Sequence, residues 1–332
     1  MKTVAIDQDV VDEILNNIEE ELNLKFVHVR PINKPNVRLS RLFLILHSSD
    51  KQRYFLKLYA AQIDKAFSEG FERYRTIYRT IPDNLKVNLA EPILNNEHRG
   101  VYFSFECYLD GKPLKPFLER KLVPFKRKEN AISQCLTWLV DFKKTFDSLE
   151  IHKTDLLVNL KQYREFFDCS GEEIFLLELL EQRIDSSSYE NKYFIQHGDL
   201  SIENVLIIKE TFGIFDWELT GSEAIPHHDL FVFLTTGIYS IENCFDKNRE
   251  NGFRYIFSKK RNRDLFVESL RSYAKGLNIK SNFSHLFFPY YLITLPVILK
   301  KRRSSSMTIA FARKNAEIYA ARHKEIDKLL SP

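Results

Sequence analysis

The stretch Gln196-His197-Gly198-Asp199-Leu200-Ser201-Ile202-Glu203-Asn204 runs directly into a short apolar segment at 205–209, and a second apolar segment follows at 213–217. Two short apolar runs separated by a few residues predict a pair of antiparallel strands. In that hairpin Asn204 and Asp216 come near each other, because the Cβ atoms of cross-strand neighbours lie about 5 Å apart. Amide and carboxylate oxygens are ligands that magnesium accepts. The hairpin therefore predicts half of a metal site.

Asp199 precedes Asn204 by five residues and lies on the loop that enters the first strand. A carboxylate on such a loop can face the metal site without being paired in a sheet, so it suits a base or an orienting group for a substrate hydroxyl. Taken singly, Asp199 could be a turn cap, Asn204 a turn residue and Asp216 an ion-pairing acid at a strand end. Their joint spacing favours the functional interpretation.

The residues His197-Gly198-Asp199, Asn204, the apolar hairpin and Asp216-Trp217-Glu218 match the pattern H-G-D-x-x-x-x-N followed by D-W-E. With this pattern the chain resembles the aminoglycoside phosphotransferase and choline kinase superfamily, the small-molecule branch of the protein-kinase-like fold. The resemblance implies that Asp199 is the catalytic base and that Asn204 and Asp216 bind Mg²⁺. In that family an acid at the position of Asp229 steadies the catalytic loop.

The fold class implied by the resemblance is α+β and bilobal, a protein-kinase-like fold. We expect a small antiparallel-sheet lobe over residues 1–105, which binds the nucleotide. A larger, mostly helical lobe over 106–332 is expected to carry the catalytic and acceptor-binding residues. No internal repeat is visible, so a solenoid is not predicted.

Composition is ordinary for a soluble globular protein: 332 residues, of which 44% are hydrophobic and 28% charged. The 49 Lys and Arg against 45 Asp and Glu leave a net charge of +4, too small to indicate nucleic acid or a membrane surface. The four cysteines lack C-x-x-C spacing, and Asp7 and Asp9 occupy the region where a signal peptide is apolar. The longest apolar run, 286–299, is too short to span a bilayer. A cytoplasmic location is the simplest prediction.

The N-terminal third predicts a helix over 9–22, antiparallel strands over 26–30, 41–47 and 53–59, and a helix over 64–81. None of the ten glycines has G-x-G or G-x-x-x-x-G spacing, so a Rossmann fingerprint and a Walker A loop are absent. Nucleotide binding must therefore depend on other residues.

Lys57 is the candidate for phosphate binding, because in the third strand it shares a face with Phe55 and Tyr59. A lysine between aromatic neighbours is costly to bury unless an anion meets it. Either Glu69 or Glu72 of the following helix could pair with it. Glu72 lies nearer the buried stripe at about 100° per residue, so we expect a Lys57–Glu72 ion pair. The resemblance connects this pair with the α- and β-phosphates.

A further apolar strand over 101–108 runs into an Asp-Gly step at 110–111, which breaks regular structure. By resemblance this is the hinge, where backbone groups of Glu106, Cys107 and Tyr108 contact the adenine edge. A plain crossover between the lobes is the alternative.

The loop at 31–40 departs from the family, because it carries two prolines and no glycine where relatives usually have Gly or Ser. Proline lacks an amide donor, so this loop would depend on Lys34 and Arg38 to bind phosphate. The choice between ATP and GTP stays open.

Helical periodicity over 130–146, 155–167 and 172–184 precedes the hairpin, and similar segments follow at 229–241, 263–275, 284–300 and 306–330. We expect Pro289 and Pro296 to interrupt the segment at 284–300. Tyr290, Tyr291 and the basic run at 300–303 are either part of an acceptor wall or core aromatics and a solvated helix end.

The predicted function is transfer of the γ-phosphate of ATP, or GTP, to a hydroxyl of a small molecule such as an aminoglycoside, choline, a sugar or a similar alcohol. Mg²⁺ is the expected metal, and the oligomeric state is open. Two alternatives remain. The glycine-free loop suggests a catalytically inactive, kinase-like nucleotide-binding module. A metal phosphohydrolase would instead use His197, His228 and Asp229 as ligands.

Overall fold

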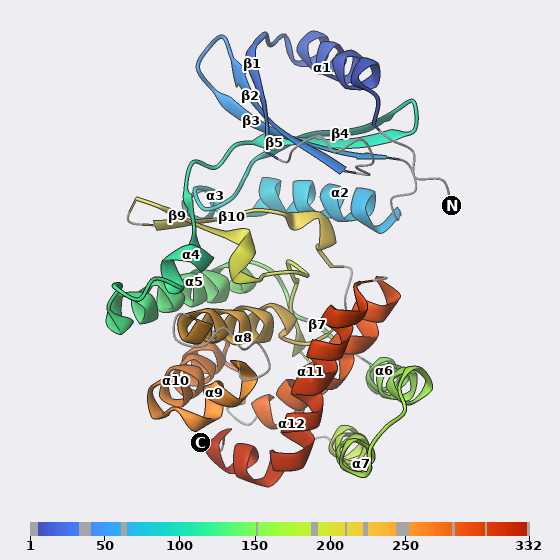
Figure 1. Ribbon diagram of the computed structural model, residues 1–332, viewed down its shortest axis with the longest axis vertical. Helices are drawn as coiled ribbons and strands as arrows, with labels where there is room; N and C mark the ends of the chain where they lie inside the picture. Colours follow the sequence, from blue (N-terminus) through green and yellow to red (C-terminus); the bar gives the residue numbers. More distant parts are fainter. Residues whose placement is uncertain are drawn as a thin grey trace. The chain divides into compact units, whose positions relative to one another are not determined.

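The computed structural model of the protein describes residues 6–32, 41–60, 65–150, 152–186, 192–209, 211–221, 225–243, 252–280, 283–302 and 304–330. The chain divides into two compact units (Figure 1): unit 1 comprises 1–112 and 206–222, and unit 2 comprises 113–205 and 223–332. The expected boundary at 105/106 differs from this division in two ways. The end of the hinge strand stays in unit 1, and the hairpin with the Asp-Trp-Glu segment returns to it.

Unit 1 is built on one antiparallel sheet with the strand order β1-β2-β3-β5-β4. The strands are β1 (Phe26–Pro31), β2 (Arg41–Ser48), β3 (Arg53–Ala60), β4 (Pro92–His98) and β5 (Val101–Cys107). Four of these strands were predicted. The fifth, β4, has a polar second half, Asn-Asn-Glu-His, that carries no strand periodicity. A small antiparallel sheet followed by a mostly helical part confirms the expected α+β class.

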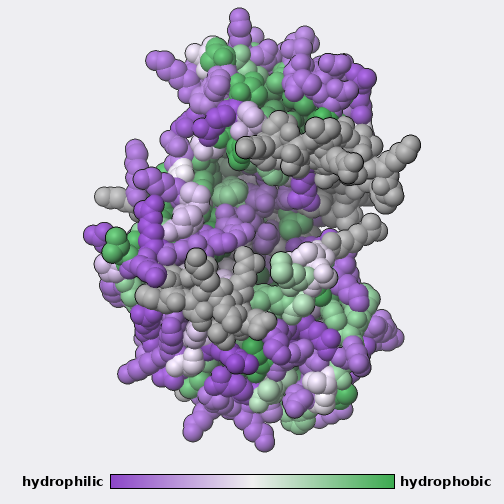
Figure 2. Space-filling model, in the orientation of Figure 1, coloured by the Kyte–Doolittle hydropathy of each residue, from purple (hydrophilic) through white to green (hydrophobic). Residues whose placement is uncertain are grey.

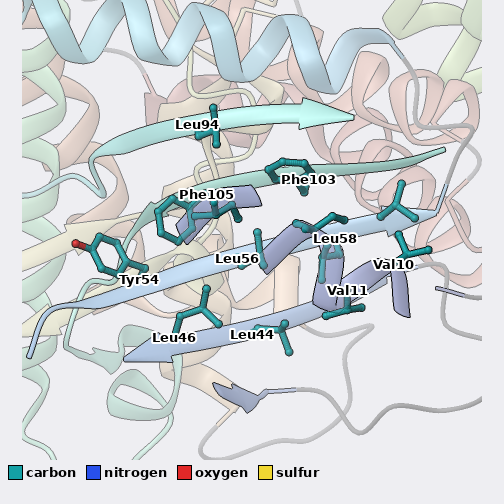
Figure 3. Packing of buried hydrophobic residues seen from close by; sticks show 13 residues of the cluster. Val10, Val11, Leu44, Leu46, Tyr54, Leu56, Leu58, Leu94, Phe103 and Phe105 are labelled. Atoms are coloured by element: carbon teal, nitrogen blue, oxygen red, sulfur yellow. The ribbon is translucent and has the colours of Figure 1, made fainter. Parts of the chain in front are cut away.

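Helix α1 (Gln8–Leu22) covers one face of this sheet, as its apolar spacing predicts. Figure 3 shows Val10 and Val11 of the helix against alternate residues of the strands, which point to the same side. The buried set contributed by the strands is Leu44, Leu46, Tyr54, Leu56, Leu58, Leu94, Val101, Phe103 and Phe105. The opposite face of β3 and β5 is therefore the face on which Lys57 lies.

Helix α2 (Lys65–Thr80) lies on the other side of the sheet (Figure 1) and packs against the 3-10 turn η2 (Trp217–Leu219). The Tyr74 ring stacks on Trp217, with ring centroids 4.8 Å apart and planes inclined by 7°. Gly70 faces the main chain of η2 so closely that a Cβ there would lie 1.8 Å from the carbonyl oxygen of Glu218. Only glycine permits this approach.

The hairpin strands β9 (Val205–Ile208) and β10 (Thr211–Ile214) are neighbours in one sheet, as predicted. The second strand is shorter than expected, because the chain leaves it before Asp216 and starts η2 at Trp217. Asp216 has φ 69°, a left-handed conformation that aspartate adopts more readily than most residues. Short helix α3 (Asp83–Lys86) precedes Asn88, whose Nδ2 donates to the Phe212 carbonyl and holds β10 in unit 1.

Unit 2 is mostly helical (Figure 1), and its long helices match the predicted segments within a few residues. Its helices are α4 (Leu114–Leu118), α5 (Phe125–Lys144), α6 (Lys153–Phe166), α7 (Gly171–Asp185), α8 (His228–Asn243), α9 (Gly252–Ser258), α10 (Lys260–Leu277), α11 (Phe283–Lys301) and α12 (Ser306–Leu330). Short strands β7 (Leu149–Glu150) and β8 (Lys192–Tyr193) pair with each other, and β6 (Lys112–Pro113) pairs with β9. Helices α4 and α9 were not predicted, because each is too short to display a full apolar stripe.

Helix α11 runs unbroken through Pro289 and Pro296, where the sequence predicted interruptions. Among the described residues it is the one helix whose length and composition suffice to cross a membrane, and 78% of its most apolar window is buried inside the protein. It packs against α12, α6 and α7. Its apolar surface is thus used in the core of unit 2.

Hydrophilic side chains cover most of the visible described surface (Figure 2). Of the large hydrophobic side chains that are exposed, Val27, Val29 and Ile32 lie on or beside β1, and the others come from scattered positions: Val87, Leu122, Val158, Ile174, Phe175 and Met307. Scattered exposed hydrophobic residues are normal on a protein surface and indicate no particular partner.

Replacing Gly70 tests how tightly α2 is held against η2. Gly70→Ala should lower the free energy of unfolding by about 1–3 kcal/mol, because the added methyl group overlaps a carbonyl oxygen that cannot easily move. Gly171→Ala is the matched control, since a Cβ there meets nothing within 4 Å. The control should leave stability unchanged or raise it by up to about 1 kcal/mol. Urea unfolding measures both; equal effects would contradict the close approach.

Candidate functional site

Lys57 is buried in unit 1, with a relative exposure of 4%. It lies in the middle of β3, opposite Phe43 of β2 and Ser104 of β5. Its Nζ donates to Asp216 Oδ1 at 2.6 Å and lies 3.6 Å from Glu106 Oε1. Burial alone would lower the pKa of the ammonium, but the Asp216 and Glu106 carboxylates hold that pKa well above its usual range. Lys57 is therefore a charged lysine enclosed by two acids.

Glu106 is the most deeply buried of these acids, with a relative exposure of 3%. It lies opposite Phe55 in the β3–β5 register, so its side chain is on the same face as Lys57. Burial raises the pKa of Glu106 to about 7, and nearby Asp216 and Glu218 add to this effect, while Lys57 opposes it. The carboxylate thus titrates near neutral pH.

Aromatic side chains and a second acid surround this cluster. The Phe43 and Phe55 ring centroids are 6.0 Å apart, and Lys57 Nζ lies 5.7 Å from the Phe55 centroid. The Tyr59 hydroxyl donates to Glu218 Oε2. Burial raises the pKa of Glu218. The Asp-Trp-Glu segment is thus fastened to β3 at two points, through Asp216 and through Glu218.

The expected Lys57–Glu72 ion pair is not formed. Glu72 is about half exposed and pairs with Arg75 at 3.5 Å, while Glu69, also about half exposed, pairs with Arg73 at 3.6 Å. The reason is the rotation of α2, because Gly70 and Tyr74 turn toward η2 and carry both glutamates away from β3. In the described part of the chain, Lys57 takes its acidic partners from β5 and from the segment after β10.

The predicted hinge lies at the end of β5, and the backbone N–H groups of two of its three residues already donate to other carbonyls. The Cys107 N–H donates to the Glu91 carbonyl at 2.9 Å, and the Tyr108 N–H donates to the Arg53 carbonyl at 3.0 Å. A nucleobase that needed either donor would have to displace a hydrogen bond of the sheet. The predicted loop with Lys34 and Arg38 lies outside the described residues.

In unit 2, the predicted catalytic loop brings Asp199 and Asn204 together. The Asn204 side-chain Nδ2 donates to the Asp199 carbonyl at 2.8 Å and to Asp199 Oδ2 at 3.2 Å. The short turn η1 (Ile202–Asn204) closes the loop and places Asn204 directly before β9. Because the amide nitrogen faces Asp199, Asn204 Oδ1 is the atom that can bind a cation.

Asp229, at the start of α8, holds the backbone of this loop through two hydrogen bonds. Asp229 Oδ2 accepts from the His197 N–H at 2.8 Å, and Oδ1 accepts from the Gly198 N–H at 3.0 Å. Lys143 of α5, fully buried, lies 3.4 Å from Asp229 Oδ2 and donates to the Ile195 carbonyl at 2.9 Å. Burial lowers the pKa of Lys143, and Asp229 opposes that shift. The arrangement matches the steadying acid that the resemblance implies.

His197 and His228 do not form the metal site that a phosphohydrolase would require. His197 Nδ1 accepts from the Asp199 N–H at 3.2 Å, which braces the turn, and both oxygens of Asp229 serve the loop amides. Burial lowers the pKa of His228 to about 4. Within the described ranges, no three His, Cys, Asp or Glu side chains are grouped so that they could hold a metal. The predicted Mg²⁺ ligands, Asn204 and Asp216, are an amide and a carboxylate, so they are a different kind of group from these.

Tyr290 and Tyr291 are both buried in unit 2. The Tyr290 hydroxyl donates to the Leu156 carbonyl at 3.2 Å, as expected of a core aromatic. Tyr291 packs edge-on against His228 and lies near enough to Asp199 for that carboxylate to raise its pKa, after the larger effect of burial. In the basic run, Lys300 donates to the Phe166 carbonyl at 2.8 Å, and Arg303 lies outside the described residues.

A surface pocket of about 770 Å³ in unit 2 is formed by the start of α7 together with α9 and α12. None of the predicted site residues lines it. Four cationic side chains line it together with four acidic ones, so its charges are balanced. The acidic residues are Asp168, Glu172, Glu173 and Glu317. The pocket is thus separate from the predicted chemistry.

Two buried side chains of the candidate site were given no role in the sequence analysis, although each carries a signal: Lys143, and Glu106, which was predicted only for a backbone contact. Glu106 is an acid within an apolar strand, which predicts a buried charge in need of a partner. Lys143 falls on the apolar stripe of α5, one helical turn after Leu139, where a lysine is out of place. Both could have been found by searching apolar stripes for charged residues.

The comparisons with known proteins give likenesses in fold only. No family model matches the sequence, and no curated protein matches it. A structure of the spectinomycin phosphotransferase APH(9)-Ia, in complex with ADP and spectinomycin, has a TM-score of 0.45 at 10% identity and covers 93% of this chain and 94% of that one. A choline/ethanolamine kinase family protein from Mesorhizobium loti has a TM-score of 0.48 at 13% identity and covers 97% and 95%.

A kinase domain is also similar. The PknI kinase domain of Mycobacterium tuberculosis, as a double mutant, has a TM-score of 0.42 at 11% identity, with 76% of this chain and 96% of that one covered. At such identities the function of this chain has to be inferred from its own residues.

Because Asp229 holds the predicted catalytic loop and is paired with buried Lys143, we expect these two residues to be strongly coupled. Asp229→Asn should destabilise the protein by about 3–5 kcal/mol, because it leaves the Lys143 ammonium buried without its counter-charge. Adding Lys143→Met should recover part of this loss, giving a coupling energy of about 0.5–3 kcal/mol in a double-mutant cycle. Urea unfolding of the four proteins measures it, and strictly additive single effects would show that the two charges do not interact.

The raised pKa of Glu106 predicts a pH-dependent difference in stability. A carboxyl whose pKa rises from 4.5 to about 7 on folding loses stability as pH climbs between those values, because the unfolded chain releases its proton first. Glu106→Gln removes that loss, so its stability relative to wild type should improve by roughly 2–3 kcal/mol from pH 4.5 to pH 8. Asp216, Glu218 and Lys57 are present in both wild type and Glu106→Gln, so the comparison isolates the titration of Glu106. A difference that does not change with pH would contradict the raised pKa.

Proposed function

We propose that the protein is a phosphotransferase that moves the γ-phosphate of ATP, or GTP, to a hydroxyl of a small molecule. The observation that supports this most directly is the Asp199–Asn204 pair, in which a carboxylate and an amide are joined on one short loop. The pair occurs within the H-G-D-x-x-x-x-N pattern and is braced by Asp229. A loop fixed in this way suits the positioning that phosphoryl transfer demands.

Asp199 has the role of base in this proposal. It orients the acceptor hydroxyl and takes its proton as the oxygen forms a bond to the γ-phosphorus. The bond between that phosphorus and the bridging oxygen breaks, and the nucleoside diphosphate leaves with the electron pair. Lys57 contacts the phosphates of the nucleotide, and its positive charge offsets their negative charge.

The proposed Mg²⁺ ligands are Asn204, through Oδ1, and the Asp216 carboxylate. Both supply oxygen, which is the donor that Mg²⁺ prefers, and Mg²⁺ keeps several waters, so two protein ligands suffice. When bound, the metal would neutralise charge on the transferring phosphate. Lys57 now donates to Asp216 Oδ1, so binding a cation there requires the lysine to share that carboxylate.

The acceptor is a small molecule carrying a hydroxyl, and choline, amino sugars, other sugars and thiamine-like alcohols are all compatible with these residues. A cytoplasmic location is part of the proposal. A kinase-like module that binds a nucleotide without turnover is a second candidate, because the loop at 31–40 carries two prolines and no glycine. Thermal shift with ATP and Mg²⁺, followed by an ATPase assay, separates binding from turnover.

Replacing Asp199 tests the proposed chemistry. Asp199→Ala should lower turnover on the true acceptor by about a hundredfold or more, because general-base catalysis is lost. Phosphate transfer from labelled ATP, screened over alcohols, sugars and aminoglycosides, identifies the acceptor and then measures the variant. Asp141→Asn, which removes an exposed acid of α5 that pairs with Lys144 at 3.8 Å, is the control and should keep wild-type turnover. An Asp199→Ala protein as active as the control would end this assignment.

A further inference from the structure

We propose that Glu106 of β5 positions Lys57 for the nucleotide phosphates, in the place of a glutamate from α2. This inference rests on the proposed function, since it assigns how the phosphate-binding lysine is held. It concerns the side chain of Glu106, whereas the sequence predicted a backbone contact with the nucleobase at this residue.

The sheet itself fixes the pair. Lys57 lies opposite Ser104 and Phe55 opposite Glu106, so Lys57 and Glu106 are diagonal neighbours on one face of β3 and β5. Diagonal neighbours in an antiparallel pair are about 7–8 Å apart, within reach of two long side chains. Their charged atoms lie 3.6 Å apart. The backbone hydrogen bonds of two central strands therefore set the position of the carboxylate relative to the lysine.

Helix α2 cannot supply the partner in its present orientation. Gly70 is in contact with the Glu218 main chain, and Tyr74 stacks on Trp217, so the face of α2 that meets η2 is fully committed. The side chains of Glu69 and Glu72 are 47% and 51% exposed and pair with arginines of their own helix. Rotating α2 to bring either glutamate to Lys57 would break the contacts of Gly70 and Tyr74.

A buried carboxylate is costly to keep unless it has a task. Glu106 is 3% exposed, and Lys57 is its ion-pair partner in the described part of the chain. Asp216 indicates what that task is. Its Oδ1 lies 2.6 Å from Lys57 Nζ, and the same carboxylate is the proposed metal ligand. A divalent cation at Asp216 would repel the Lys57 ammonium, and Glu106 is then the carboxylate that retains it. Lys57 can thus point at phosphate without leaving its place.

The test compares three isosteric variants: Glu106→Gln, Glu69→Gln and Glu72→Gln. Binding of ADP with Mg²⁺ is measured by calorimetry, and KM for ATP and for the acceptor is measured where turnover is present. Glu106→Gln should weaken ADP binding and raise KM for ATP on the order of tenfold, with KM for the acceptor unchanged. Glu69→Gln and Glu72→Gln should stay within about twofold of wild type.

A double mutant separates positioning from a general structural role. In a Lys57→Met background, Glu106→Gln should have no further effect on ADP binding, because the residue acts through the lysine. Glu106→Asp, which keeps the charge on a shorter arm, should lie between Glu106→Gln and wild type, and it serves as the working variant if Glu106→Gln does not fold.

Each outcome decides one question. Wild-type protein that binds neither ADP nor ATP with Mg²⁺ overturns the proposed function, and this inference with it. Wild-type binding that Glu72→Gln or Glu69→Gln weakens, while Glu106→Gln does not, overturns the inference alone and returns the role to α2. A loss in Glu106→Gln that persists fully in the Lys57→Met background also overturns it, because the residue then acts on folding and not on the lysine.

Discussion

Unit 1 depends on one buried positive charge. Removing an ammonium from water costs several kcal/mol, so Lys57 is tolerated only because Glu106 and Asp216 approach it from different strands and segments. These residues are distant in the sequence, and their meeting fixes β5 and the segment after β10 against β3. The stacking of Tyr74 on Trp217 and the contact of Gly70 with Glu218 hold α2 against the same segment. The charge cluster and the packing therefore enforce one arrangement.

Unit 2 also contains a buried lysine paired with an acid, and there the acid holds a loop backbone. Lys143 is buried beside Asp229, and the two oxygens of Asp229 accept the amides of His197 and Gly198. The Lys143–Asp229 pair thus acts on the backbone of the predicted catalytic loop, whereas the proposed role of Asp199 as base belongs to its side chain. A loop held through its backbone can keep a fixed geometry while its functional side chains face a substrate. Buried lysine–acid pairs organise both halves of the proposed machinery.

The sequence predicted those features whose signals are local. Strands and long helices followed from apolar periodicity, and Asp199 and Asn204 followed from their spacing on one loop. That α2 does not supply the partner of Lys57 could not be predicted, because this depends on the rotation of α2, and Gly70 sets that rotation by meeting a carbonyl that is distant in sequence. The left-handed backbone of Asp216, with φ 69°, also lacks a sequence signal, since aspartate adopts it only where surrounding contacts enforce it.

The occupied amides of Cys107 and Tyr108 bear on where nucleotide affinity would come from. A base edge that finds no backbone donor contributes less to binding. Phosphate contacts would then carry a larger share of the free energy. Such contacts act through charge and fall off with misplacement, so they require a lysine whose position is fixed. A glutamate on β5, an inner strand hydrogen-bonded to the strand that carries Lys57, meets that requirement directly, whereas the two glutamates of α2 pair with arginines of their own helix.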